Sequence, residues 1–268
     1  MQKIWVCGAR GQIGQAVNDV VDKLEFEMLD TDVDDLDVTD TDEVLRFGEM
    51  NRPDIIINCS GMTDISSCEE NPSQAFKVNA LGARNLAIVA AKMQAKMVQL
   101  STDDVFDGKS TEPYTEFDIT NPGTVYGKSK LAGENYVKEF TTKHFIVRST
   151  WVYGKGQNFI NGFLKKVDAG EQLSIASDQF GSPTSANELA RFLLHLVHTS
   201  EYGTYHATNK GVCSRYAFAQ AREHAMDDVV GEIVLAVGDE DLLAVETVVG
   251  PGRHGARAHL REIATGLR

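Results

Sequence analysis

The chain has 268 residues and a formal net charge of −13, a length that suits one core with a smaller appended lobe. The acidic balance argues against nucleic acid or an anionic membrane as a partner. No apolar run approaches the roughly 20 residues of a membrane span. The opening MQKIWVC leads directly into an expected strand rather than a signal peptide, so we expect a soluble, cytoplasmic protein. Its four cysteines show neither metal-ligand spacing nor a disulfide framework.

Apolar runs and segments of helical period alternate along the first two-thirds of the chain. Strands are predicted near residues 3–7, 26–30, 54–58, 96–101, 144–148 and 172–175. Helices are predicted near residues 12–23, 42–50, 73–93, 124–142, 158–169 and 187–199. Such alternation is typical of a parallel sheet covered by helices on both faces. We therefore predict an α/β fold with a doubly wound parallel sheet.

A glycine-rich loop follows the first predicted strand. Gly8, Gly11 and Gly14 are spaced G-x-x-G-x-x-G between the apolar run and a helical pattern. Glycines at this spacing let the backbone turn tightly and approach a pyrophosphate, whose charge the helix N-terminus stabilises. An ordinary glycine-rich turn is the alternative. The strand-loop-helix context favours a dinucleotide site of the Rossmann type.

Acidic residues follow the second predicted strand, about where folds of this kind bind the adenine ribose. Asp30 and Asp32 favour NAD, because a carboxylate there bonds a ribose hydroxyl. Arg10, inside the glycine loop, could instead pair with the 2′-phosphate of NADP. The pattern predicts NADPH or NADH as the cofactor and leaves the choice between them open.

The segment LSTDDVFDG, residues 100–108, follows the fourth predicted strand. A hydroxyl at the carboxyl end of a strand lies where open α/β sheets bind ligands. Ser101 or Thr102 could therefore hydrogen-bond a substrate carbonyl. A Ser-Thr-Asp run also opens turns, and taken by itself the segment favours that simpler interpretation.

Tyr126 and Lys130 stand four residues apart in VYGKSKLAGE and so share one helix face. An ammonium group beside a phenol lowers the phenol pKa from its free value of about 10. That suits a group that protonates a carbonyl oxygen as hydride reaches the carbon. The spacing alone is common on helices. Together with the glycine loop and the segment over residues 100–108, the Tyr126–Lys130 pair predicts an NAD(P)H-dependent reductase.

These elements resemble the extended short-chain dehydrogenases/reductases and, more narrowly, the dTDP-4-dehydrorhamnose reductase family. The resemblance runs from residue 1 to about residue 220 and rests on GARGQIG (8–14), RPDIIIN (52–58), VNALGARNLA (78–87), STDDVFDG (101–108), the Pro-x-x-x-Tyr-Gly-x-Ser-Lys-x-x-Gly-Glu run (122–134), VRSTWVYG (147–154) and DQFGSPTSA (178–186). It implies a Rossmann cofactor domain over residues 1–150. Residues 151–268 would form a mostly substrate-binding lobe, interleaved with the first domain.

The resemblance also implies roles for single residues. Thr102, Tyr126 and Lys130 would form the catalytic set that reduces the C4 keto group of dTDP-4-dehydro-L-rhamnose, with Tyr126 as the acid. Expected cofactor contacts are Gly8, Arg10, Gly11, Gln12, Ile13, Gly14, Asp30, Asp32, Met62, Thr63, Tyr126 and Lys130. Expected substrate contacts are Asp104 and Trp151. A homodimer is common in this fold, but the sequence leaves the oligomeric state open.

Two departures from the family pattern bear on function. Asp104 stands where the family has an aromatic residue, so Thr102-Asp103-Asp104 also resembles the corresponding run of sugar-nucleotide 4,6-dehydratases. A dehydratase is therefore one alternative. Gln15 follows the last glycine of the loop, where some members carry a glutamate that helps a metal ion bridge a dimer. We accordingly expect no bound metal.

The third departure is the segment beyond about residue 220, where the resemblance fades. Arg253, Arg257, Arg261 and Arg268 crowd this segment, and the last lysine is Lys210. A frame-shifted reading or a diverged substrate lobe would each produce such a composition. The segment also keeps open a non-catalytic, NADP-binding regulatory subunit similar to the beta subunit of methionine adenosyltransferase.

Overall fold

The structure is a computed structural model that describes residues 1–156, 158–171, 173–224, 233–235 and 261–263. Most of the divergent segment, including Arg253, Arg257 and Arg268, lies outside the described residues. The two hypotheses about its composition therefore stay open.

One large sheet organises the chain. Six of its strands are parallel, in the order β2-β1-β3-β4-β5-β10. Their bounds are β1 Gln2–Cys7, β2 Phe26–Thr31, β3 Ile55–Asn58, β4 Lys96–Thr102, β5 His144–Ser149 and β10 Gly203–Asn209. The short β12, Ile233–Leu235, pairs antiparallel with β10 at the edge. The strand order reverses between β1 and β3, and sheets of this kind bind ligands beyond the carboxyl ends of the strands at such a point.

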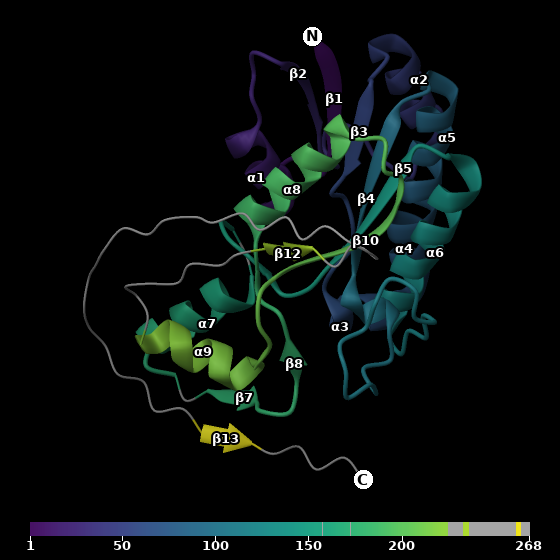
Figure 1. Ribbon diagram of the computed structural model, residues 1–268. Coiled ribbons are helices and arrows are strands. Elements are labelled where there is room, and N and C mark those ends of the chain that lie inside the picture. Colours follow the sequence, from purple (N-terminus) through teal and green to yellow (C-terminus); the bar gives the residue numbers. More distant parts are fainter. Residues whose placement is uncertain (157, 172, 225–232, 236–260, 264–268) are drawn as a thin grey trace.

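Helices cover both faces of the sheet (Figure 1). One face carries α1 Gln12–Val20 and α8 Ala186–His198. The other carries α2 Thr41–Asn51, α4 Pro72–Phe76, α5 Ala83–Met93 and α6 Val125–Phe140. This arrangement confirms the predicted α/β fold with a doubly wound parallel sheet.

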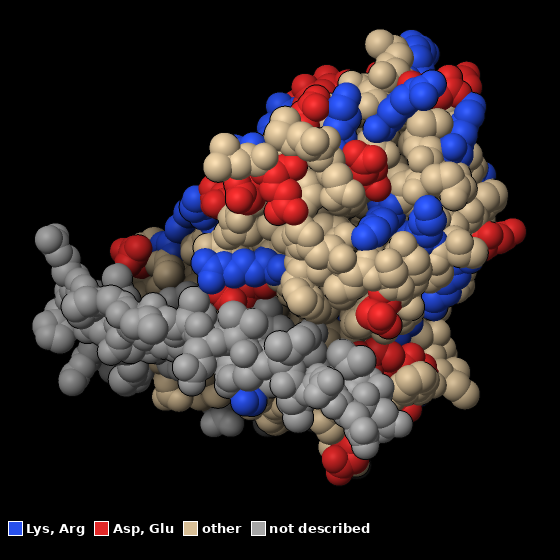
Figure 2. Space-filling view, turned by 45° about the horizontal axis from the view of Figure 1, so that its top comes forward, with Lys and Arg blue, Asp and Glu red and all other residues tan. Residues whose placement is uncertain are grey.

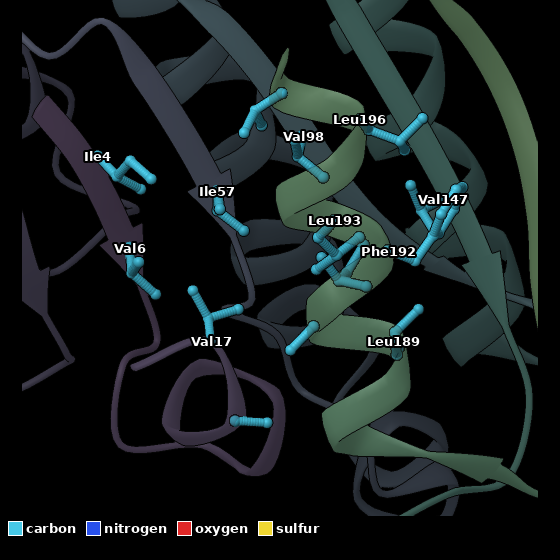
Figure 3. Packing of buried hydrophobic residues seen from close by; sticks show 14 of the residues in the cluster. Ile4, Val6, Val17, Ile57, Val98, Val147, Leu189, Phe192, Leu193 and Leu196 are labelled. Carbon is cyan, nitrogen blue, oxygen red and sulfur yellow. The ribbon is translucent and has the colours of Figure 1, made fainter. Parts of the chain in front are cut away.

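Alternation along the strands divides the core in two. In β1, Ile4 and Val6 face α1 and α8, whereas Trp5 and Cys7 face α2 and α5. Figure 3 shows the first of these clusters, in which α8 lays its leucines and Phe192 over the sheet. Because both faces are covered, the strands read as nearly continuous apolar runs.

A small lobe lies beyond the carboxyl ends of the strands (Figure 1). It consists of α7 Phe159–Asp168, β7 Ser174–Ala176, β8 Phe180–Gly181, β11 Cys213–Ser214 and α9 Arg215–His224. Two further strands, β6 Val152–Tyr153 and β9 Thr184–Ser185, pair with each other. In the described part of the lobe, Phe163, Ile175 and Ala219 form a buried cluster.

Several elements differ from the sequence prediction. The strand expected near residues 172–175 forms β7, but it pairs with β13, Arg261–Ile263, outside the large sheet. The unpredicted β10 extends the sheet beside β5 instead. The single helix expected over 73–93 is divided by a π-helical turn at Lys77–Gly82. The short α3, Ile65–Glu70, and α9 were also not expected.

Among the described residues, no helix has the length and apolar character that crossing a bilayer requires. On the face shown in Figure 2, acidic and basic side chains are interspersed in small groups rather than gathered into one charged field.

Candidate active site

Helix α6 presents Tyr126 and Lys130 to the end of β4. The helix begins after Thr124, whose hydroxyl accepts a hydrogen bond from the Gly127 N–H at 3.0 Å. Gly127 lies so close to the turn after β4 that a Cβ atom there would be 2.0 Å from the Asp104 carbonyl oxygen. This close approach, possible only for glycine, brings the first turn of α6 against residues 101–104 at the end of β4.

Thr102 is the last residue of β4 and is buried. Its Oγ1 accepts the Asp104 N–H at 3.1 Å and donates to Asp103 Oδ1 at 3.1 Å. The Tyr126 hydroxyl is hydrogen-bonded with the same Thr102 hydroxyl. The structure thus brings Thr102 and Tyr126 together, as the sequence predicts for a pair that shares one carbonyl oxygen.

The pKa of Tyr126 is raised, chiefly because the phenol is surrounded by protein, and also by the negative charges of Asp104 and Asp103. The hydrogen bond with Thr102 acts in the opposite direction. This differs from the expectation that Lys130 would lower the phenol pKa, because burial is the largest cause of the shift and Lys130 is not among the groups that act on the phenol. The consequence is a Tyr126 that carries its proton at neutral pH and can act as an acid.

Lys130 lies four residues further along α6, and only 4 % of it is exposed. Its Nζ donates to the Leu100 carbonyl oxygen at 2.6 Å, which anchors the side chain to β4. Burial lowers the pKa of Lys130 to about 8, while the charges of Glu134 and Cys59 raise it. Lys130 therefore supplies a positive charge beside the strand end that carries Thr102.

A buried ion pair supports this arrangement and was not foreseen from the sequence. Glu134 on α6 is fully buried and accepts hydrogen bonds from Arg148 Nε at 2.9 Å and Arg148 Nη2 at 2.7 Å. The Ser101 hydroxyl donates to the same carboxylate at 2.6 Å. Glu134 thus joins α6, β4 and β5 next to the predicted catalytic residues.

The glycine loop has the geometry that a dinucleotide pyrophosphate needs. Gly8 has φ +74°, and a Cβ atom at Gly14 would lie 2.3 Å from the Gly8 carbonyl oxygen. Gly11 caps α1 without a side-chain hydrogen bond, so the first-turn N–H groups have no capping side chain. The predicted contacts Gln12 and Ile13 are in that turn. The loop therefore fits a pyrophosphate group.

Arg10 is surrounded by carboxylates at the end of β2. Its backbone N–H donates to Asp32 Oδ2 at 2.8 Å, and its Nη2 donates to Asp35 Oδ2 at 3.0 Å and lies 3.3 Å from Asp34 Oδ2. Asp30 is exposed on β2, across from Val6 of β1. The guanidinium that the sequence offered for a 2′-phosphate is thus already paired with acids.

Met62 and Thr63 follow β3, where the resemblance places a cofactor contact. The Asn79 side chain accepts from the Met62 N–H at 2.8 Å and donates to the Met62 carbonyl at 2.9 Å. The same Asn79 amide also donates to Ser129 Oγ on α6 at 2.9 Å. Because Asn79 is in the π-helical turn, this irregular turn fixes the loop next to the catalytic helix.

A pocket of about 620 Å³ lies between the loop after β3, which contains Thr63, and the small lobe. Residues 63–66 line one side, and the lining on the other side is Asn158, Phe159, Asn161, Gly162, Lys165 and Arg215. Trp151 is not among the lining residues. Its indole instead supports Arg215, whose guanidinium carbon is 4.3 Å from the ring centroid.

The charges of Asp103 and Asp104 act on both the Tyr126 phenol and the Arg215 guanidinium. Asp103 Oδ2 accepts a hydrogen bond from the Thr150 hydroxyl at 2.6 Å. Burial raises the pKa of Asp104 to about 6, helped by the Asp103 charge and opposed by Arg215. Arg215 was missed from the sequence, since no local pattern marks a lone arginine at a helix start. Among the described residues, no group of three or more His, Cys, Asp or Glu side chains could hold a metal ion.

The doubly wound sheet, the glycine loop and the Thr102–Tyr126–Lys130 arrangement define an NAD(P)H-dependent oxidoreductase of the extended short-chain dehydrogenase/reductase class. The family described as RmlD substrate binding domain matches residues 1–240. The chain therefore belongs to the RmlD family of sugar-nucleotide reductases.

Solved structures and relatives agree with this assignment. A dTDP-4-dehydrorhamnose reductase of Clostridium acetobutylicum is 42% identical, with a TM-score of 0.81 over 84% of this chain and 81% of that one. The Bacillus anthracis reductase, in complex with NADP, is 40% identical, with a TM-score of 0.80 over 82% and 79%. The spore coat polysaccharide biosynthesis protein SpsK of Bacillus subtilis is 36% identical over 82% of this chain and 78% of its own length.

Proposed function

We propose that the protein reduces the C4 keto group of dTDP-4-dehydro-L-rhamnose to give dTDP-L-rhamnose, with NADPH or NADH as the hydride source. The observation that carries the proposal is the arrangement of Tyr126, Thr102 and Lys130 at the end of β4. Relatives named dTDP-4-dehydrorhamnose reductase, such as that of Aggregatibacter actinomycetemcomitans at 34% identity over 88% of this chain, support the substrate.

Each residue has a role that follows from its surroundings. Bound NAD(P)H supplies the hydride. Tyr126, whose phenol is protonated at neutral pH, donates its proton to the C4 oxygen as hydride reaches the carbon. Thr102, which donates to Asp103 in the structure, can turn the same proton toward the carbonyl. Lys130, anchored to the Leu100 carbonyl of β4, would supply the positive charge of the site and hold the nicotinamide ribose.

The rest of the proposal concerns binding and assembly. The first-turn N–H groups of α1, from Gln12 to Gly14, would hold the cofactor pyrophosphate, and Asp30 or Asp32 its adenine ribose. Asp104 and Trp151 would face the sugar. Residues 1–150 would mostly bind the cofactor and residues 151–268 mostly the substrate. We further propose a cytoplasmic homodimer.

The test is the Tyr126→Phe variant, assayed by loss of nicotinamide absorbance with NADPH and dTDP-4-dehydro-L-rhamnose. Loss of the acid should reduce kcat by about 10³-fold, while NADPH affinity stays near that of the unchanged protein. Tyr136→Phe is the matched control, because this tyrosine is on the same helix and packs against Phe140. Full turnover by Tyr126→Phe would contradict the mechanism.

One observation favours a second candidate, a sugar-nucleotide 4,6-dehydratase. Asp103 and Asp104 both have raised pKa values and lie next to Thr102, and a dehydratase needs acids there for elimination of water. Incubation with dTDP-glucose and NAD+ separates the two functions. A dehydratase would form the 4-keto-6-deoxy sugar, whereas the proposed reductase would leave dTDP-glucose unchanged.

A further inference from the structure

Tyr126 needs a new proton after every turnover of the proposed reaction. The carbonyl carbon receives a hydride, and with it two electrons, while Tyr126 gives its phenolic proton to the carbonyl oxygen. The alcohol product leaves with that proton. A phenolate therefore remains, and it must receive one proton from solvent before the next substrate can be reduced.

The Thr102 hydroxyl joins Tyr126 to Asp103. Its Oγ1 accepts the Asp104 N–H at 3.1 Å, donates to Asp103 Oδ1 at 3.1 Å and is hydrogen-bonded with the Tyr126 hydroxyl. A hydroxyl has one proton to donate and two lone pairs that accept. Because the Thr102 proton goes to the Asp103 carboxylate, the Tyr126 O–H is the donor in its bond with Thr102. The three side chains thus form a directed chain from Tyr126 through Thr102 to Asp103.

This chain leads from the buried end of β4 to the protein surface. Thr102 is only 5 % exposed, whereas Asp103, the first residue of the short turn Asp103–Val105, is exposed. The second carboxylate oxygen of Asp103 accepts the Thr150 hydroxyl at 2.6 Å. Thr102 and Thr150 therefore hold the carboxylate from two sides, and water can still reach the residue.

The surroundings of Asp103 also allow its carboxyl group to carry a proton for a short time. Although the residue is exposed, the protein around the carboxyl group removes water and raises its pKa. The hydrogen bonds from Thr150 and Thr102 and the positive charge of Arg215 act in the opposite direction. A raised pKa means that protonation from water at neutral pH requires less free energy than for an ordinary aspartate.

We propose that Asp103 is a proton-relay residue, which returns a proton from solvent to Tyr126 through the Thr102 hydroxyl. Asp103 takes a proton from water and passes it to Thr102 Oγ1, while the proton of Thr102 moves to the Tyr126 phenolate. The O–H bonds of Asp103 and Thr102 break, new ones form on Thr102 and Tyr126, and Asp103 is again a carboxylate. The relay rests on the proposed function, because it is needed where Tyr126 is the acid.

The experiment separates the first turnover from those that follow it. The full chain, saturated with excess NADPH, is mixed rapidly with dTDP-4-dehydro-L-rhamnose, and nicotinamide absorbance is followed into the steady state. Asp103→Asn removes the acid and keeps the shape of the side chain. Asp118→Asn is the matched control, because Asp118 is also exposed and also accepts a threonine hydroxyl, that of Thr115 at 3.0 Å. Circular dichroism and Tm establish that each variant is folded.

We expect Asp103→Asn to complete its first turnover at the rate of the unchanged protein, since Tyr126 begins with its own proton. The kcat should then fall by about 10- to 100-fold, because the phenolate waits for a proton. Formate or acetate in the buffer should restore kcat in Asp103→Asn by supplying a carboxylic acid. Asp103→Glu should recover most of the lost kcat for the same reason, and Asp118→Asn should behave as the unchanged protein.

Three results would overturn the relay. An unchanged kcat in Asp103→Asn would mean that Tyr126 is reprotonated by another route. A first turnover slowed as much as kcat would mean that Asp103 only positions Thr102. A kcat that formate and acetate do not restore would exclude proton transfer as the cause of the loss.

Failure of the relay is distinguishable from failure of the proposed function. If the unchanged protein does not oxidise NADPH in the presence of the keto sugar, the proposed function is wrong and the relay is wrong with it. If the unchanged protein reduces the keto sugar and Asp103→Asn does so with the same kcat, the reductase stands and only the relay fails.

Discussion

The large sheet and the small lobe have very different hydrophobic cores. The sheet is packed on both faces by fully buried side chains from strands and helices. Among the described residues, the buried cluster of the lobe consists of Phe163, Ile175 and Ala219. The residues proposed for chemistry come from the end of β4, the turn after it and α6, whereas the pocket residues Arg215 and Lys165 come from the lobe. Chemistry that needs fixed distances thus sits on the better-packed part, and recognition on the part with less buried area.

The largest expected effect is a loss of stability when the buried Glu134–Arg148 pair beside the large sheet is broken. Glu134→Gln removes the partner of the buried Arg148, so the free energy of unfolding should fall by about 3–5 kcal/mol. Lys155→Met is the comparison, because it breaks the exposed pair with Asp19 that links the loop before α7 to α1. Its cost should be below about 1 kcal/mol. Urea unfolding followed by circular dichroism measures both, and equal costs would remove the contrast between the regions.

A matched pair of glycines gives the next largest effect. Gly14→Ala would place Cβ 2.3 Å from the Gly8 carbonyl oxygen and 2.7 Å from Ala9 Cα, so the loop must shift. We expect a loss of about 1–3 kcal/mol in stability, together with weaker NADPH binding. Gly162→Ala, inside α7, meets no atom within 4 Å. It should stabilise the helix by about 0.5–1 kcal/mol.

Thermal unfolding and NADPH titration of both alanine variants make the measurement. If Gly14→Ala stabilised the protein, as Gly162→Ala is expected to do, the conclusion that Gly14 is too tightly packed to accept a Cβ atom would be wrong. The comparison between the regions would then lose one of its two supports.

The smallest expected effect is a pH dependence of kcat that comes from Lys130 on α6, beside the large sheet. With a pKa of about 8, Lys130 is charged below that pH and loses its proton as the pH rises through it. The kcat should therefore fall above about pH 8, by up to tenfold for each further pH unit. Glu134 raises the pKa of Lys130, so Glu134→Gln should move the midpoint to lower pH. If the kcat–pH profile of Glu134→Gln kept the same midpoint, the conclusion that Glu134 raises the pKa of Lys130 would be wrong.

Much of the sheet side could be read from the sequence because its signals are local. The strand, glycine loop and helix over residues 2–20 follow one another without interruption, and α6 at Val125–Phe140 was expected over 124–142. Tyr126 and Lys130 share a helix face by spacing alone. The predicted roles of the individual site residues remain predictions, since the structure shows their placement and not their chemistry.

Features that depend on distant segments could not be read in this way. β10 finds its place beside β5 through the path of the chain over residues 150–202, and β7 leaves the sheet for the same reason. Arg215 meets Trp151 across 64 positions, and Arg148 meets Glu134 from a different element. The expected lowering of the Tyr126 pKa failed because spacing along a helix carries no information on how deeply the phenol is enclosed.

The stacking of Arg215 on the Trp151 indole also has an evolutionary consequence, because Gly181 packs against the same ring. Any side chain larger than hydrogen at 181 would displace the Trp151 ring, and with it the Arg215 guanidinium that lies over the ring. Positions 151, 181 and 215 should therefore change together among related sequences. A lineage that loses the arginine would be free to vary the glycine, and one that keeps all three would keep the same cation at the pocket.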